Sequence, residues 1–170
     1  MDKNIQEYKY KFNFRNGDYK EFTIKLNKTD LILISSKDDY LPPWTKLDFQ
    51  QCTNCPLDIN EHPYCPIAKN LVSLLYCFHN YRSFEEATIS CETKERPYSK
   101  TTSIQEGLSS MIGIYMVASG CPIMNKLKPM VNFHLPFSSL EETCFRVLST
   151  YLLAQYFLAN PKARLVFLAW

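Results

Sequence analysis

The sequence predicts an α+β fold, in which a small antiparallel N-terminal β-sheet packs with a helical C-terminal half through a cysteine-rich metal loop. Apolar and polar residues alternate along residues 7–14 and 22–26, as in strands with one buried face. Residues 67–80 and 103–119, and the stretch after residue 138, repeat apolar residues at helical spacing instead. Four cysteines lie between these patterns: Cys52, Cys55, Cys65 and Cys121.

The N-terminal strands are predicted from their period of two. The first strand has an aromatic face formed by Tyr8, Tyr10, Phe12 and Phe14. Asn16-Gly17 follows it, and this pair favours a tight hairpin turn. The second strand alternates through Phe22, Ile24 and Leu26. We expect a third strand over Leu31–Ile34 and a fourth near residues 87–91, in a sheet with one polar face.

Three helices are predicted from their caps and apolar stripes. Pro66 suits the first position of a helix to about Asn80. Ser103 and Glu106 form a capping box for the second helix, which Gly120 ends. Ser138 and Glu141 form another for the third. The expected buried stripes are Leu71, Leu74, Leu75 and Phe78 in the first helix, and Leu140, Cys144, Val147, Leu148, Tyr151 and Leu152 in the third.

Length and composition favour a single domain over residues 1–170, with a β-rich part at 1–50, the metal loop at 51–66 and a mainly helical part at 67–170. The net charge of +2 argues against a protein built around nonspecific phosphate binding. We see no signal peptide and no apolar run long enough for a membrane span, so we expect a cytoplasmic protein. In a reducing compartment, seven cysteines are free thiols or metal ligands.

The cysteine pattern predicts a thiolate-bound metal. Cys52 and Cys55 form a CxxC pair, which brings two sulfurs to one metal from a single turn. Cys55, Cys65 and Cys121 are each followed by proline, which fixes the backbone where the chain leaves a metal. Cys65 and Cys121 also precede expected helix starts, where the helix dipole favours a thiolate. We therefore expect Cys52, Cys55, Cys65 and Cys121 to converge on one metal; the alternative is ordinary buried thiols.

Either Zn²⁺ or an iron–sulfur cluster fits four thiolates, and the sequence favours neither clearly. His62 could replace Cys65 or Cys121 in a zinc site, although a polar loop residue is the simpler interpretation.

The remaining cysteines and histidines receive structural interpretations. Cys77 and Cys144 are expected in helix cores and Cys91 in a strand. His134, near Cys121, could hydrogen-bond a ligand of the metal, but we favour a core histidine with a backbone partner. Lys94, Arg96 and Lys100 could contact an anion or nucleic acid, and we favour a solvated loop. No GxGxxG, Walker A, HExxH or nucleophile-elbow motif is present.

Several motifs together resemble an uncharacterised bacterial family, a domain of unknown function with an N-terminal strand region and a helical C-terminal half. They are Gln51-Cys-Thr-Asn-Cys-Pro-Leu57, Cys65-Pro-Ile-Ala-Lys-Asn-Leu71, Ser119-Gly-Cys-Pro122, Phe133-His-Leu-Pro-Phe137, Glu142-Thr143 and Tyr151-Leu-Leu-Ala-Gln-Tyr156. The resemblance covers about residues 8–156 and implies a bacterial cytoplasmic protein. It implies no reaction. It also implies that members continue past the long helix, so we expect missing sequence or a partner to cover the apolar end.

Three functions follow as hypotheses. The first is a non-enzymatic, metal-stabilised interaction or regulatory module, since no catalytic constellation is found. The second is an iron–sulfur redox or sensor protein. The third, ranked last, is a hydrolase or transferase that uses Cys144 with His134. For the first, we expect a protein partner or self-association through the apolar end, Val166, Phe167, Leu168 and Trp170, because such patches mark interfaces.

Overall fold

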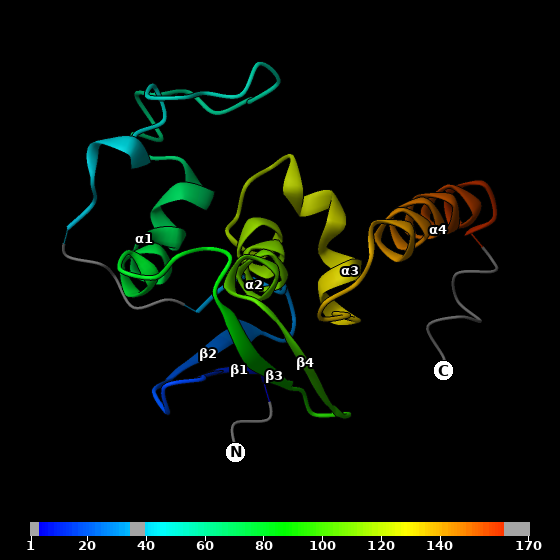
Figure 1. The fold of residues 1–170 in the computed structure, drawn as a ribbon. Coiled ribbons are helices and arrows are strands. Elements are labelled where there is room, and N and C mark those ends of the chain that lie inside the picture. Colours follow the sequence, from blue (N-terminus) through cyan, green and yellow to red (C-terminus); the bar gives the residue numbers. More distant parts are fainter. Residues whose placement is uncertain (1–3, 35–39, 162–170) are drawn as a thin grey trace. The chain divides into compact units, whose positions relative to one another are not determined.

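The computed structural model describes residues 4–34 and 40–161, and it has an α+β fold. The chain forms two compact units, Met1–Phe137 and Ser138–Trp170. The expectation of a single domain stays a prediction, as does the contact surface at residues 166–170, which lie outside the described residues. The first unit holds a sheet and two long helices, and the second holds one long helix (Figure 1).

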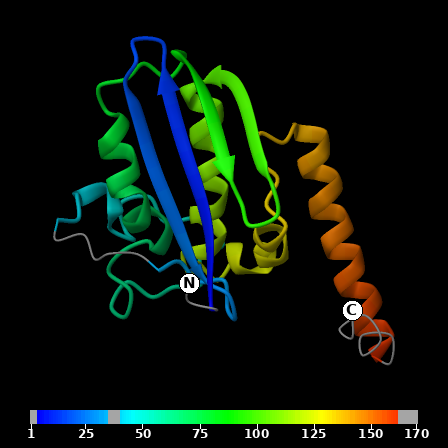
Figure 2. The same cartoon turned by 90° about the horizontal axis from the view of Figure 1, so that it is seen from below.

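The sheet has four antiparallel strands in the order β2-β1-β3-β4. Its strands are β1 (Ile5–Phe14), β2 (Tyr19–Asn27), β3 (Glu86–Glu92) and β4 (Pro97–Ser103). Register follows the alternation: Tyr10 pairs with Phe22 and with Cys91, which places apolar side chains on one face. Helices α1 (Pro66–Phe78) and α2 (Ile104–Ala118) cover that face, whereas the other face carries polar residues (Figure 2). The expected sheet with one polar face is confirmed.

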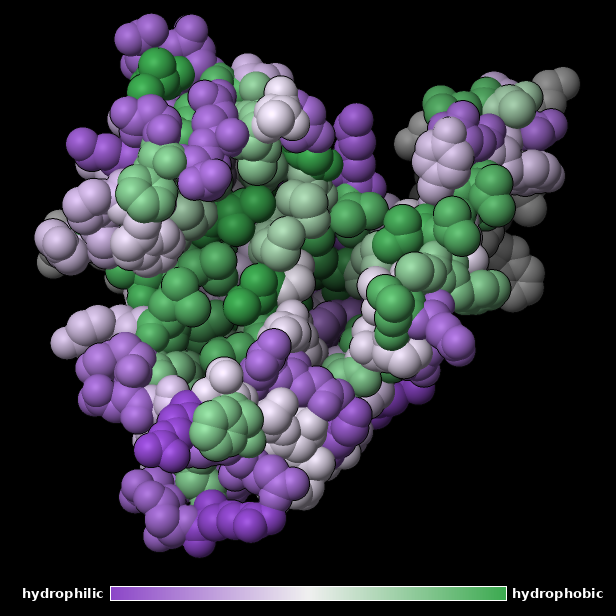
Figure 3. All heavy atoms as spheres, turned by 45° about the horizontal axis from the view of Figure 1, so that its top comes forward, coloured by the Kyte–Doolittle hydropathy of each residue, from purple (hydrophilic) through white to green (hydrophobic). Residues whose placement is uncertain are grey.

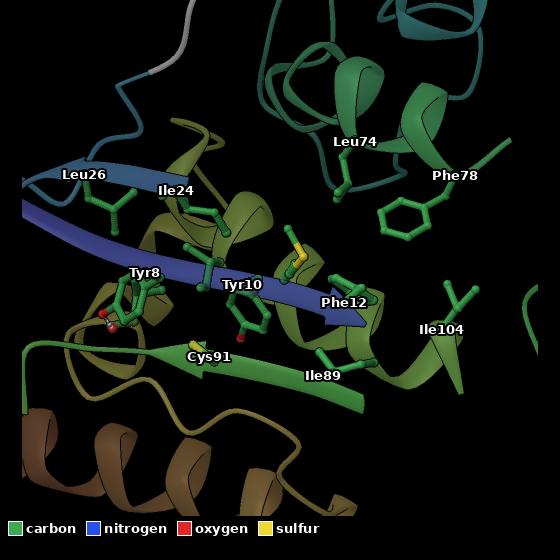
Figure 4. Close-up of a cluster of buried hydrophobic side chains, with 14 of the residues drawn as sticks. Tyr8, Tyr10, Phe12, Ile24, Leu26, Leu74, Phe78, Ile89, Cys91 and Ile104 are labelled. Atoms are coloured by element: carbon green, nitrogen blue, oxygen red, sulfur yellow. Dashed lines mark hydrogen bonds between the residues drawn. The ribbon is translucent and has the colours of Figure 1, made fainter. Parts of the chain in front are cut away.

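The core fills the space between the sheet and these helices. Tyr10, Phe12 and Ile89 are fully buried on the sheet side, and Leu74 of α1 faces them (Figure 4). The closest approach is at Gly107 of α2. A Cβ there would lie 2.4 Å from Ile89 Cδ1 and 2.7 Å from Phe12 Cε1, so α2 sits against the sheet through this glycine.

Two of the predicted strand features are wrong. Residues 31–34 do not form a strand; Leu33 makes a single bridge to Leu26, and Leu31 has a positive φ of 56°, which breaks an extended run. The segment around Lys100, interpreted as a solvated loop, is instead strand β4. It was missed because its residues, PYSKTTS, are mostly polar and the strand lies at the edge of the sheet. The turn at Gly17 and the strand near 87–91 are as predicted.

The three predicted helices are present, but some of their caps and buried residues differ from the prediction. Ser103 caps α2, and its side chain accepts a hydrogen bond from Glu106 N. The predicted box for the last helix is one residue off: Ser139 and Glu142 form it, and they open α4 (Leu140–Ala159). Leu75 was expected in the α1 core, but it is 41% exposed. Short segments η1 (Pro43–Thr45), η2 (Met124–Leu127) and α3 (Lys128–Asn132) were not predicted.

The second unit is, in its described part, the single helix α4. Its predicted buried stripe is wrong, because no described residue of α4 is buried. Cys144, expected in a helix core, is exposed. The spacing of apolar residues shows which of them share one face of a helix. It does not show whether that face packs inside the unit or faces outward. Over residues 4–34 and 40–161, no helix has both the length and the apolar character needed to cross a membrane.

Candidate functional site

The cysteine-rich segment is a loop that is closed at its neck by backbone hydrogen bonds. Leu47 N donates to Pro63 O at 3.0 Å, and Cys65 N donates to Thr45 O at 2.8 Å. Thr45 and Leu47 are buried at this neck. Between residues 48 and 63, however, nothing is buried, and only Cys55 and Leu57 are even half-buried. The loop therefore lacks an apolar core of its own.

Cys52 and Cys55 lie in a local turn within this loop. Cys55 N donates to Cys52 O at 3.0 Å, the turn geometry that lets a CxxC pair present both sulfurs on one side. Gln51 Nε2 donates to Leu57 O at 3.0 Å and closes the same turn from outside. Cys52 is exposed, and Cys55 is half-buried. Both thiols can thus be reached by a metal ion from solvent.

Cys65 ends the loop and caps α1. It has extended backbone angles, φ −64° and ψ 122°, and Pro66 takes the first helical position as predicted. No side chain caps this helix start. Cys65 thus stands where the first backbone N–H groups of α1 have no acceptor within the helix.

Cys121 follows the C-terminal end of helix α2. Gly120 has a positive φ of 88°, the conformation expected where a helix stops. Cys121 N donates to Ser119 Oγ at 3.3 Å, and Asn125 N donates to Cys121 O at 2.9 Å, so the backbone of this corner is fixed. The thiol is half-buried.

All seven cysteines and all three histidines lie in the described part of the chain, and the cysteines are free thiols. Within that part, no three His, Cys, Asp or Glu side chains are grouped as a metal site. The four predicted ligands are thus not brought together. Their donor chemistry still fits Zn²⁺ or an iron–sulfur centre, because accessible thiolates are soft ligands and the unpacked loop has room to rearrange.

A buried polar cluster lies elsewhere in the first unit, and sequence reasoning missed it. Tyr10 of β1 contacts Ser110 Oγ of α2 at 2.8 Å and His134 Nε2 at 2.6 Å. Ser110 Oγ also accepts from Phe137 N at 3.3 Å, and Tyr8 OH donates to Val131 O at 2.6 Å. These bonds fix the segment 131–137 onto the sheet. The available signal was the pair of tyrosines on a buried face, since buried phenols need partners.

His134 has both a side-chain and a backbone partner: Nε2 contacts the Tyr10 hydroxyl, and the backbone N–H donates to Val131 O at 3.1 Å. Its ring meets Tyr8 edge-on at 5.3 Å between centroids. The Tyr10 hydroxyl thus joins Ser110 Oγ to His134 Nε2, and Ser110 Oγ also accepts from Phe137 N–H. Cys144 belongs to the second unit and is exposed.

Burial controls the acid–base properties of the cluster. It raises the pKa of Tyr8 to about 12 and that of Tyr10 further, mainly by desolvation. Cys91 of β3, fully buried beside Tyr10 (Figure 4), has its pKa raised to about 11 for the same reason. All three groups stay neutral at ordinary pH, which suits a structural core better than acid–base chemistry.

The basic cluster expected near residue 98 is part of the β3–β4 hairpin. Thr93 and Arg96 close the turn through their backbones and the Thr93 hydroxyl. Lys100 pairs with Glu106 at 2.5 Å, and Thr102 also donates to that carboxylate. The hydrogen bond from Lys100 is the main cause that lowers the pKa of Glu106. Lys100 is therefore neutralised locally, which weakens the interpretation of an anion site.

A comparison with protein families identifies the family of this chain. The family described as Domain of unknown function (DUF6901) matches residues 8–164, nearly the whole chain. The chain belongs to this family, which confirms the expectation of an uncharacterised domain family. No curated protein and no solved structure matches the chain.

Proposed function

We propose that the protein is a non-enzymatic interaction or regulatory module whose cysteine loop is ordered by one thiolate-bound metal, with Cys52, Cys55, Cys65 and Cys121 as ligands. The observation that carries the proposal is the loop at residues 48–63. It is closed at its neck, it presents a CxxC turn to solvent, and it has no buried residue to hold its shape. A bound metal would order such a segment, since apparent binding free energies of structural zinc sites are about 10 kcal/mol or more.

The proposal also places the protein in a reducing compartment, the cytoplasm, because the seven thiols are free. The alternative is an iron–sulfur redox or sensor protein. It uses the same ligands and draws support from the three Cys-Pro steps.

Elemental analysis of anaerobically purified protein is the first test. We expect one zinc per chain in a colourless protein, or iron and sulfide with visible absorption under the alternative. Removal of the metal by a strong chelator should lower the melting temperature sharply, because the loop then keeps only the hydrogen bonds of its neck and turns among the described residues. Cys52→Ser should lose the metal, while Cys144→Ser, an exposed thiol in α4, should keep it. A metal-free protein as isolated, or an unchanged melting curve after verified metal loss, contradicts the proposal.

The contact surface of the module is the apolar face of α4, and its proposed occupant is α4 of a second copy. Apolar residues recur along the whole helix with steps of four and three, the spacing of helices that pair side by side. The set is Leu140, Cys144, Val147, Tyr151, Ala154 and Leu158. Hydrophobic side chains run along this helix in Figure 3.

Large apolar side chains of this face are exposed. Leu140, Tyr151 and Leu158 are 79%, 60% and 72% exposed, so a helix packed along the face would remove much of their apolar surface from water. A membrane surface is disfavoured, because Arg146 is the one cation within α4 and amphipathic membrane helices are rich in cations.

Light scattering over a range of concentrations tests this contact. We expect the full chain to dimerise and Tyr151→Glu to shift it to a monomer, because a carboxylate would then lie in the apolar contact. The matched control is Ser149→Glu, two residues away on the opposite side of α4, and it should leave the dimer intact. A full chain that stays monomeric at every concentration contradicts the contact.

A further inference from the structure

The turn between β1 and β2 holds the chain's single asparagine–glycine step, Asn16-Gly17. Both residues are exposed. Gly17 has a φ of 91°, which side chains oppose, and a Cβ there would meet nothing within 4 Å. Asparagine is a thermolabile residue, because the next backbone nitrogen can attack its side-chain amide carbon. Glycine leaves that nitrogen unshielded, so Asn16 is the asparagine of this chain that is best placed to react.

Three hydrogen bonds of the closed turn oppose this reaction. Gly17 N donates to Phe14 O at 3.1 Å, so the attacking nitrogen is already occupied. Asn16 Oδ1 accepts from Asp18 N at 3.0 Å, and Asn16 Nδ2 donates to Asp18 Oδ2 at 2.7 Å. Both polar atoms of the amide are thus held by Asp18. Since bond formation needs the two reacting atoms in contact and correctly oriented, the turn must open first.

We propose that Asn16 is a modification site, at which asparagine becomes aspartate or isoaspartate at a rate set by the opening of the β1–β2 turn. Gly17 N forms a bond to Asn16 Cγ, and the side-chain nitrogen leaves as ammonia with the proton of Gly17 N. Water then opens the cyclic imide. Cleavage at Cγ leaves aspartate, and cleavage at the backbone carbonyl leaves isoaspartate. Water is the one further reactant, and no electrons are exchanged.

The product weakens the turn because of the group that faces it. The donor Nδ2 is replaced by an oxygen of a carboxylate, so two negative charges face each other where Asp18 accepted a hydrogen bond. The repulsion is modest and is screened by salt, because both side chains are exposed. Isoaspartate also lengthens the backbone within the turn. We therefore expect modification to loosen the β1–β2 hairpin from this end.

Peptide mapping by mass spectrometry tests the site in the full chain. Samples are kept at neutral pH with and without enough urea to unfold the protein, and the replacement of each asparagine amide by an acid is followed over time. Asn16 should convert at least about tenfold faster in the unfolded chain, because folding keeps the turn closed. In the folded chain, Asp18→Ala should speed the conversion, since Nδ2 loses its acceptor. Asn60, which is exposed and precedes glutamate, is the internal control and should convert more slowly than Asn16 when unfolded.

Asn16→Asp tests the effect of the product. This variant should unfold at a lower urea concentration than the unaltered chain. Adding Asp18→Asn should recover most of the loss, because an amide and a carboxylate then face each other again.

Each part of the proposal has an outcome that overturns it. A lack of conversion at Asn16 in the unfolded chain overturns the modification site. Equal rates in the folded and unfolded chains overturn the control by the turn, and an unchanged rate in Asp18→Ala overturns the part played by Asp18. An Asn16→Asp variant as stable as the unaltered chain overturns the loosening of the hairpin.

Discussion

Tyr10 shows what a single hydroxyl group can do in this core. Its side chain is fully buried, and its oxygen joins strand β1 to Ser110 of α2 and to His134. No buried side-chain oxygen or nitrogen in the described residues lacks a hydrogen-bond partner. Such a network is costly to disturb, because a buried polar group that loses its partner keeps its full desolvation penalty.

Tyr10→Phe should therefore lower the free energy of unfolding by about 1–3 kcal/mol. The substitution keeps the ring and leaves Ser110 and His134 without the phenol. Tyr19→Phe is the matched control: Tyr19 is 63% exposed in the same sheet, so a change within about 0.5 kcal/mol is expected. Urea denaturation of both variants measures the effect. Equal changes in the two variants would show that the cluster adds nothing to stability.

The buried thiol of Cys91 should make the protein sensitive to alkali. Its folded pKa, about 11, lies above the roughly 8.5 of a free thiol, so the unfolded chain ionises first. The stability that the neutral Cys91 thiol contributes is complete below about pH 8.5. It is lost as the pH rises towards 11, by at most about 1.4 kcal/mol per pH unit. Cys91→Ala should lose less stability over this range than the unaltered chain.

The free energy of unfolding is measured at pH values from about 8 to about 11, the range in which thiols ionise. Its slope against pH checks the prediction. Cys144→Ala, which removes an exposed thiol, should keep the slope of the unaltered chain. An unchanged slope in Cys91→Ala would show that another group causes the alkaline loss.

At the residue scale, the sequence predicted which side chains are buried in the sheet but not what they bond to. Alternation placed Tyr8, Tyr10 and Cys91 inside, and the structure agrees. Tyr8 and Tyr10 bond to Val131, Ser110 and His134, which lie 100 to 124 positions further along the chain. Such pairs depend on how α2 and the following segment cross the sheet, and local periodicity carries no information about that.

Helix α2 contains two glycines whose surroundings are opposite. Gly107 faces the sheet, where an added methyl group would collide with Ile89 and Phe12. Gly113 is exposed, and a Cβ there would meet nothing within 4 Å. The same residue type thus permits close packing at one position and weakens the helix at the other.

Gly107→Ala should destabilise the protein by about 1–3 kcal/mol through overpacking. Gly113→Ala should stabilise it by about 0.5–1 kcal/mol, because alanine is the better helix former and no contact opposes it. The two variants share one helix and one chemical change, so each serves as control for the other in thermal or urea unfolding. Two changes of the same sign would contradict the described approach of α2 to the sheet.

At the scale of elements, the strongly periodic segments were predictable, and the weakly periodic ones were not. Strands β1, β2 and β3 and helices α1, α2 and α4 follow from alternation, proline positions and caps. Strand β4 was missed because an edge strand buries little, and its polar residues hide the period of two. The metal ligands were predicted from the CxxC spacing, from the prolines that follow three of the cysteines and from expected helix starts. Their convergence stays a prediction, because local patterns carry no information about which distant side chains meet.

At the scale of the whole molecule, the buried core belongs to one unit. Every buried residue described lies before Phe137, and α4 contributes none. The family nevertheless matches residues 8–164, so α4 is part of what the family shares. The proposed pairing of α4 would give this shared segment a contact of its own.

A chain that stops after Phe137 should therefore keep a cooperative unfolding transition. The sheet, α1, α2 and the bonds between Ser110, Tyr10 and Phe137 all remain in that chain. Its unfolding free energy should fall by no more than about 1 kcal/mol, as for a change outside a buried core. Its self-association should disappear, because the apolar face of α4 is gone. Urea denaturation followed by circular dichroism, with light scattering on the same samples, measures both. A truncated chain without a cooperative transition would show that α4 packs into the fold of its own chain. One that still dimerises would place the contact between copies on the first unit, against the proposed surface.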